Sequence, residues 1–173
     1  MEYFLKTTSY ILEGGGVTLK LFFFTLVFSM PLGFLGAMGK TSHRTILTFP
    51  LGIYTSVVRG TPLLLQLFFV YYGLPLLIPA LRFERFTAAV LTFIVNYAAY
   101  FVEIFRAGIQ SIDRGQYEAA KVLGMNYRQT MVRIVLPQTI KRVLPPVSNE
   151  AITLVKDTAL VVVLGIGEIL RNS

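Results

Sequence analysis

The sequence predicts an all-α integral membrane protein, built as a bundle of several membrane-spanning helices. Of its 173 residues, 54% are hydrophobic and only 14% are charged, which is too apolar for an ordinary soluble domain. The hydrophobic residues form long blocks, whereas a soluble amphipathic helix repeats them at every third or fourth position. The chain has no cysteine and one histidine, His43. We therefore expect no metal site, no thiol chemistry and no cofactor.

The first expected span covers about residues 17–38. Residues 21–39 contain no charged side chain, and about 20 apolar residues are enough to cross a bilayer. Ser29, Gly33 and Ala37 recur at intervals of four within it. They share one side of the helix, where small side chains allow another helix to approach closely.

The next apolar block must break before it can fit a membrane. Residues 45–81 contain a single charge, Arg59, and a straight helix of that length would measure about 55 Å against a hydrocarbon core of about 30 Å. Gly60 frees the chain to turn, Thr61 suits an N-cap and Pro62 suits the first helical position. The break leaves two expected helices, an interfacial helix at 45–58 and a second span at 61–80.

Two further spans are expected in the second half of the chain. The third covers about residues 86–105 and ends at Glu103 and Arg106, which have the i,i+3 spacing of a helical ion pair. The fourth, at 143–165, has a weaker signal because it includes three ionisable residues, Glu150, Lys156 and Asp157. The Pro145-Pro146 pair should loosen its helix, since proline donates no backbone hydrogen bond.

The basic residues predict how one membrane domain, residues 1–173, is oriented. They are concentrated in the connections after the first and third spans, whereas the connection at 82–85 holds only Arg82 and Arg85 around Glu84. Positively charged connections usually stay in the cytoplasm. We therefore expect the N-terminus and the 82–85 connection outside, and the connection at 107–142 inside.

The connection at 107–142 is too long for a simple turn. Its pattern predicts short helices at 116–123 and 127–135, joined by a turn at 124–126 and stopped by Pro137. An apolar stripe with a basic rim favours docking of a cytoplasmic partner. Contact with anionic lipid headgroups is the alternative.

This connection resembles the EAA motif, EAA-x3-G-x9-I-x-LP, of permease subunits in bacterial binding-protein-dependent ABC importers. Every position of the motif is filled, by Glu118, Ala119, Ala120, Gly124, Ile134, Leu136 and Pro137. Further runs, such as Arg59-Gly60-Thr61-Pro62 and Lys156-Asp157-Thr158, are similar to the branch that imports polar amino acids. The resemblance covers about residues 14–170.

The resemblance implies a multi-pass protein of the bacterial inner membrane whose motif residues couple it to a cytoplasmic ATP-binding subunit. It also implies an extracytoplasmic solute-binding protein and a second permease subunit, identical or related. The permease is then not an enzyme, and ATP hydrolysis belongs to the partner. Permeases of this branch usually have five core spans, so a fifth span is expected to be missing here.

Polar residues inside the spans predict a substrate pathway. On the fourth span Asn149 or Glu150, Thr153, and Lys156 or Asp157 recur at helical spacing and can share one face. Asn96 and Tyr100 share a face of the third. Glu150 and Asp157 suit the ammonium of an amino acid, and Lys156 suits its carboxylate. Packing near the interface is the alternative for Lys156 and Asp157, and hydrogen bonding between helices is the alternative for Asn96 and Tyr100.

Three functional hypotheses remain. The leading one is import of a polar amino acid, driven by a partner's ATP hydrolysis. The second is a truncated membrane protein that assembles with partners but transports nothing. The third, in which the basic connection binds anionic lipid or nucleic acid, requires binding that weakens steeply with salt, and we expect no nucleic-acid partner.

Overall fold

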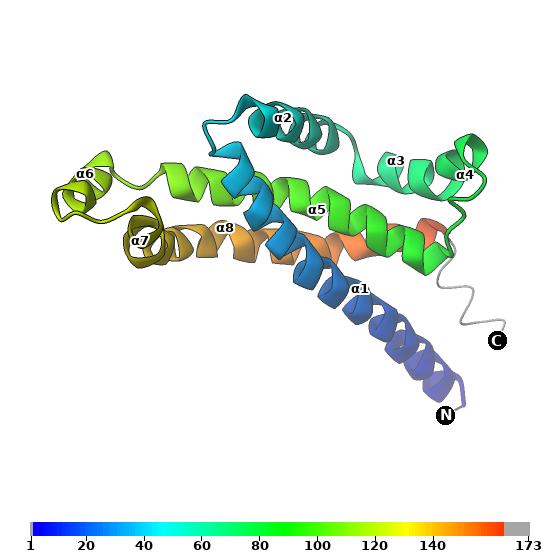
Figure 1. Cartoon of the computed structure of the whole chain (residues 1–173). Helices are drawn as coiled ribbons and strands as arrows, with labels where there is room; N and C mark the ends of the chain where they lie inside the picture. Colours follow the sequence, from blue (N-terminus) through cyan, green and yellow to red (C-terminus); the bar gives the residue numbers. More distant parts are fainter. Residues whose placement is uncertain (1, 165–173) are drawn as a thin grey trace.

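The computed structural model describes the backbone of residues 2–164 and the side chains of residues 15–161, and this part of the chain is helical (Figure 1). In chain order the elements are α1 (Glu2–Lys40), α2 (Thr45–Gly60), α3 (Leu63–Phe68), a π-helical turn (Phe69–Gly73), α4 (Leu74–Leu77), α5 (Arg85–Gln110), α6 (Arg114–Val122), α7 (Tyr127–Thr130), a second π-helical turn (Met131–Val135), α8 (Leu136–Asp157) and a 3-10 helix (Thr158–Leu164). No β-strand occurs among the described residues. The predicted all-α fold class is confirmed.

The helix α5 lies at the centre of the bundle and packs most extensively on α1. Ser29 and Ala37 of α1 are fully buried, and a Cβ placed on Gly33 would lie 2.3 Å from the Cβ of Phe101. The small-residue face predicted for the first span is therefore confirmed as the surface where α1 and α5 approach. Large buried side chains complete this core, including Leu21, Leu67, Phe93, Tyr97, Phe101 and Leu154.

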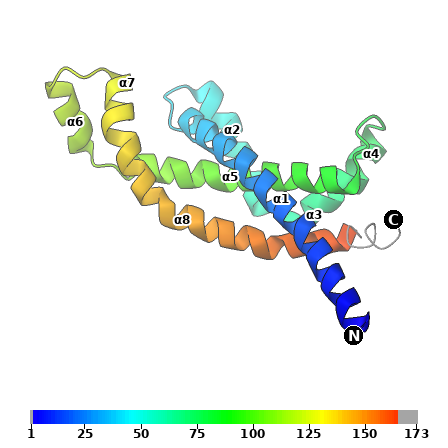
Figure 2. The ribbon, with the colours of Figure 1, turned by 90° about the horizontal axis from the view of Figure 1, so that it is seen from below.

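The neighbours of α5 differ in direction. The α1 helix runs the same way as α5, because Gly33 lies beside Phe101 and the later Lys40 bonds to Glu103. The α8 helix runs the opposite way, with Val143 close to Gly108 and Asp157 bonded to Tyr97. As Figure 2 shows, α6 and α7 lie at the end of the molecule where α5 finishes and α8 begins.

The predicted break after α2 is confirmed, with a bend of 104° between α2 and the segment formed by α3 and α4. The predicted N-cap at Thr61 is wrong. Pro62 occupies the N-cap position of α3 without a side-chain cap, and the Thr61 hydroxyl instead donates to the Val57 carbonyl oxygen at 2.9 Å. Thr61 therefore closes α2. The α4 helix then ends at Leu77, before the expected boundary at residue 80.

Two helices of the described residues are long and apolar enough to cross a membrane, Gly15–Lys40 and Arg85–Gln110. The bent pair of α2 with α3 and α4 makes a third if it counts as one span. The expected fourth span at 143–165 is not among them, because α8 carries too many ionisable residues for an apolar span. The end of that expected span, residue 165, lies outside the described residues. Pro145 and Pro146 lie inside α8, which stays α-helical across them. The expectation that this proline pair loosens the helix is therefore wrong.

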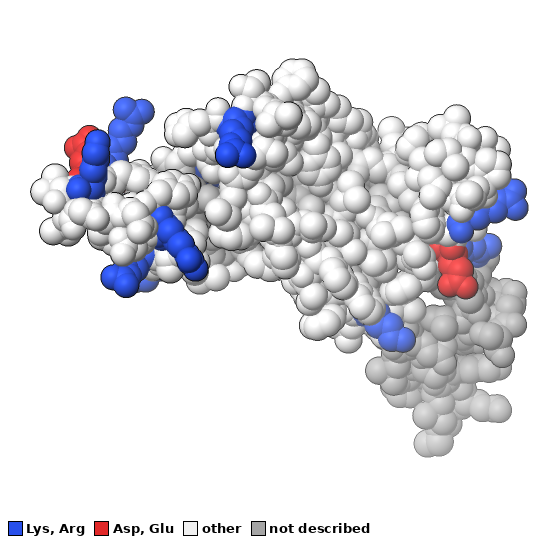
Figure 3. Space-filling view, in the orientation of Figure 1, with Lys and Arg blue, Asp and Glu red and all other residues white. Residues whose placement is uncertain are grey.

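The connection between α5 and α8 holds the two expected short helices, but the second does not stop at Pro137. From Tyr127 the chain stays helical through the π-helical turn Met131–Val135 into α8. Pro137 lies in the first turn of α8, where a missing N–H costs least. Figure 3 shows Lys and Arg side chains gathered over α6 and α7, whereas the middle of this face carries little charge.

Candidate functional site

A cavity of about 560 Å³ lies where α5 and α8 face the junction of α2 and α3. Its polar wall includes residues from three helices, namely Arg59 of α2, Asn96 and Tyr100 of α5, and Glu150, Thr153 and Asp157 of α8. We call it the acidic cavity, because its wall holds two carboxylates and one cation. Five of the seven pathway residues proposed from the sequence thus meet in one place.

Hydrogen bonds position the polar groups at this cavity. The Tyr97 hydroxyl donates to Asp157 Oδ2 at 2.7 Å, which aims the carboxylate of α8 toward α5. Asn96, only 4% exposed, donates from Nδ2 to Gln66 Oε1 at 3.1 Å. The Gln66 amide in turn donates to the Val58 carbonyl oxygen at 2.7 Å. The bend between α2 and α3 is therefore tied to the cavity wall.

The other two proposed pathway residues, Asn149 and Lys156, are exposed and line neither this cavity nor its neighbour. Successive residues of a helix point about 100° apart. Glu150 and Asp157 therefore face the cavity, while the residues just before them face away. Lys156 forms no ion pair with a described residue. No three His, Asp or Glu side chains of the described residues are placed to hold a metal ion.

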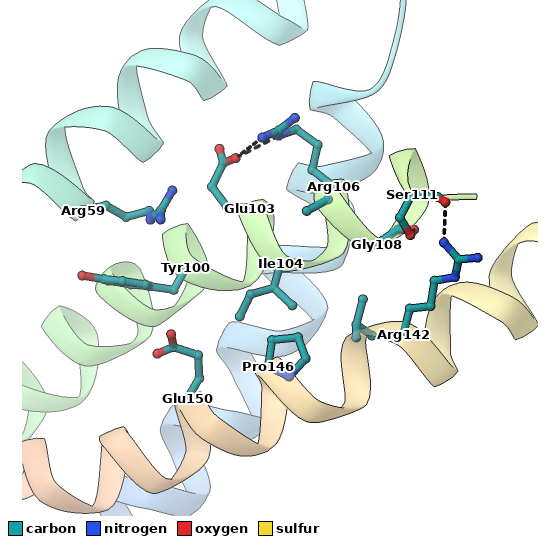
Figure 4. Close-up of a pocket in the computed structure, with 12 residues that line it drawn as sticks. Arg59, Tyr100, Glu103, Ile104, Arg106, Gly108, Ser111, Arg142, Pro146 and Glu150 are labelled. Atoms are coloured by element: carbon teal, nitrogen blue, oxygen red, sulfur yellow. Dashed lines mark hydrogen bonds and ion pairs between the residues drawn. The ribbon is translucent and has the colours of Figure 1, made fainter. Parts of the chain in front are cut away.

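Arg59 is the cavity residue that the sequence analysis did not assign to the pathway. It directly follows the interfacial helix predicted at 45–58, and its Cζ lies 5.2 Å from the centre of the Tyr100 ring, a cation–π distance. Figure 4 shows Arg59 and Glu150 approaching Tyr100 from α2 and α8. The available signal was its isolation as the one charge among residues 45–81.

A second cavity of about 640 Å³ adjoins the first, because Arg59, Tyr100 and Glu150 line both. We call it the basic cavity, since Arg106 and Arg142 join Arg59 in its wall and Glu103 joins Glu150. It lies toward the end of α5, next to the start of α8 (Figure 4).

Both oxygens of the Glu103 carboxylate in the basic cavity accept hydrogen bonds from cations. Arg106 Nε donates to its Oε2 at 2.8 Å, and Lys40 Nζ at the end of α1 donates to its Oε1. Lys40 also donates to Thr55 Oγ1 of α2 at 2.7 Å. This confirms the ion pair expected between Glu103 and Arg106. It also joins three helices at a charge cluster that the sequence did not predict.

The turn between α6 and α7 depends on Gly124, whose φ is +73°. The Gly124 N–H donates to the Lys121 carbonyl oxygen, and the Met125 N–H donates to the Ala120 carbonyl oxygen, each at 3.0 Å. These two bonds form a Schellman motif, which places a left-handed residue just after a helix. A Cβ on Gly124 would meet nothing within 4 Å, so glycine is needed for its backbone conformation, not for space inside this chain.

Comparison with known proteins places this architecture in a family. Residues 29–173 match the family described as binding-protein-dependent transport system inner membrane component. The chain belongs to this family. It is 43% identical to the arginine transport system permease protein ArtQ of Bacillus subtilis, over 95% of this chain and 74% of that protein. It is 35% identical to the glutamine transport system permease protein GlnP of Escherichia coli, over 94% and 74%.

A solved structure agrees with the sequence comparison. The crystal structure of an amino acid ABC transporter with histidines matches with a TM-score of 0.88 and 38% identity, covering 98% of this chain and 78% of that chain. The resemblance to amino acid ABC transporter permeases found in the sequence is confirmed.

In this permease the seven residues of the EAA motif divide between surface and interior. Glu118, Ala119, Gly124 and Pro137 are exposed, whereas Ala120 is fully buried. Ile134 and Leu136 are half-buried. The prediction that the apolar stripe of the 127–135 helix faces a partner is wrong for two of its members, Met131 and Val135, because both pack inside this chain against Ile109 and Ile112. Burial raises the pKa of the nearby Tyr117 hydroxyl above its ordinary value.

Proposed function

We propose that this permease subunit moves a polar amino acid through the bilayer along the wall formed by α5 and α8. The acidic cavity carries the proposal, because Glu150, Asp157 and Arg59 converge there from two helices of a largely apolar bundle. Ionisable groups at membrane depth cost several kcal/mol unless they face protein or water. Their convergence on one cavity is best explained by a polar solute.

The chemistry of the cavity fits an amino acid ammonium or a cationic side chain. Glu150 and Asp157 offer carboxylates, and Asn96, Tyr100 and Thr153 offer neutral hydrogen-bonding groups. The named relatives transport arginine and glutamine, which supports a polar amino acid without choosing between them. Lys156, earlier assigned to the substrate carboxylate, is exposed away from the cavity and is left out of the proposed site.

Energy for uphill import must come from a partner, because a conformational equilibrium shifts only through a differential interaction. We assign this role to a cytoplasmic ATP-binding subunit that docks on the segment of α6 and α7. That surface exposes apolar side chains, with Val122 at 87%, Leu123 at 76% and Tyr127 at 72%. The helix continues from α7 through the π-helical turn Met131–Val135 into α8, so a displacement of α7 is transmitted to Glu150 and Asp157 along one continuous helix.

Membership of the family supports the rest of the proposed assembly. It comprises an extracytoplasmic binding protein that delivers the amino acid and a second permease subunit, placed in the bacterial inner membrane. The basic surface over α6 and α7 (Figure 3) supports a cytoplasmic location for that end and an outside location for the N-terminus and residues 82–85.

Uptake of labelled L-arginine and L-glutamine tests the function in vesicles that contain the permease, its ATP-binding subunit and the binding protein. We expect ATP-dependent uptake of at least one of them, and a reduction of about tenfold or more for Glu150→Gln and for Asp157→Asn. Lys156→Gln is the matched control, because this charge lies beside Asp157 in sequence but outside the cavity. Complex yield is measured alongside.

Two outcomes would contradict the proposal. Normal uptake in both carboxylate variants would remove the acidic cavity from the pathway. Assembly with the ATP-binding subunit but no uptake of any amino acid would favour the alternative, a membrane protein that only assembles with partners.

A further inference from the structure

The acidic and basic cavities adjoin but differ in charge. Both are lined by Arg59, Tyr100 and Glu150. Beyond this shared wall, the acidic cavity adds only the charge of Asp157, whereas the basic cavity adds Arg106, Arg142 and Glu103. The electrostatic character therefore changes sign along α5, from the Asp157 end toward the end that carries α6.

The basic cavity keeps uncancelled positive charge. Glu103 is bonded by Arg106 and Lys40, and Arg142 donates to the Ser111 carbonyl oxygen, which carries no formal charge. The positive charge of Arg142 is thus not cancelled by a carboxylate. The cluster of Lys40, Glu103 and Arg106 likewise keeps one net positive charge.

Arg59 stands at the boundary between the two cavities. Its guanidinium contacts the Tyr100 ring, and it forms no ion pair within the described part of the chain. The Arg59 guanidinium and the Glu150 carboxylate attract each other electrostatically across the cavity. A guanidinium whose planar pair of N–H donors is free can bind a carboxylate through two parallel hydrogen bonds.

We infer that the two adjoining cavities form one passage, and that the amino acid lies in it with its ammonium toward Asp157 and its carboxylate on Arg59. The amino acid therefore travels carboxylate first toward the α6 end. This inference rests on the proposed function, and it adds an orientation and a residue that recognises the carboxylate. Arg59 makes the passage selective for amino acids over amines, because an amine leaves the guanidinium without a partner and gains nothing from the basic cavity.

The experiment compares an amino acid with the same molecule lacking its carboxylate. Whichever of L-arginine and L-glutamine the wild-type complex imports is used, paired with its decarboxylated analogue, agmatine or 4-aminobutanamide. Equilibrium dialysis measures the binding of both to the purified complex of permease and ATP-binding subunit. The wild type should prefer the amino acid, and Arg59→Gln should reduce this preference by about tenfold or more, the usual effect of losing a charge-assisted pair.

Controls separate recognition from general structural damage. Arg44→Gln removes an exposed cation at the other end of α2 and should leave the preference unchanged. Asp157→Asn should weaken both ligands by a similar factor, because both carry the ammonium. If Arg59→Gln does not assemble, Arg59→Lys keeps the charge but loses the paired donors, and the preference should fall by a smaller factor.

The inference is overturned if an assembled Arg59 variant keeps the wild-type preference, or weakens both ligands equally. These results differ from failure of the proposed function, in which the wild-type complex imports neither amino acid.

Discussion

Replacing Gly33 by alanine should separate the α1 and α5 helices, and the structure gives the size of the effect. The new Cβ would lie 2.3 Å from the Phe101 Cβ and 3.0 Å from its carbonyl carbon, against a normal carbon–carbon contact of about 3.5 Å. The obstacle is backbone and Cβ, which cannot turn aside by rotating a side chain. Forced overpacking of this kind costs about 1–3 kcal/mol.

The helix propensity of alanine offsets part of that cost, by about 1 kcal/mol. The remaining net loss of up to about 2 kcal/mol corresponds to a decrease of up to about 8 °C in the melting temperature of a chain of this size. The matched control is Gly52→Ala in α2, where a Cβ meets nothing within 4 Å. That variant should melt at or slightly above the wild-type temperature.

Thermal unfolding followed by far-ultraviolet circular dichroism in one detergent measures all three proteins. If Gly33→Ala melts at or above the wild-type temperature, the close approach of α1 and α5 does not stabilise the bundle. If both variants are destabilised equally, the loss reflects glycine in a membrane helix generally and not contact with Phe101.

Two further predictions concern the connections before and after α5. At Gly124, where φ is +73°, alanine should cost about 1–2 kcal/mol of local stability and asparagine should cost less. Hydrogen exchange of the backbone amides at the end of α6 measures this loss. If the Gly124 variant loses binding of the ATP-binding subunit but keeps normal protection of these amides, glycine is needed because a partner approaches it. Reporters fused after Ser111 and after Arg82 should lie inside and outside the cell respectively, and the opposite result would reverse the proposed orientation.

The sequence by itself determined the elements whose cause is local. Long charge-free blocks predicted the helices from about residue 17 and from about residue 86, since bilayer thickness requires about 20 apolar residues. Excess length together with Gly60 and Pro62 predicted the bend after α2. The spacing of Glu118, Gly124 and Pro137 was enough to indicate the family, because a motif of fixed length needs no tertiary information.

Tertiary structure decided which side chains meet. Helical periodicity left Asn149 or Glu150, and Lys156 or Asp157, as alternatives, and packing of α8 on α5 turned Glu150 and Asp157 toward the cavity. Arg59 reached Tyr100 because α2 packs on α5, a helix distant in the chain. The helix continued past Pro137 and across Pro145-Pro146, since a local proline signal does not include the packing that holds a helix together. Sequence spacing defines the faces of one helix, whereas partners come from the contacts between helices distant in the chain.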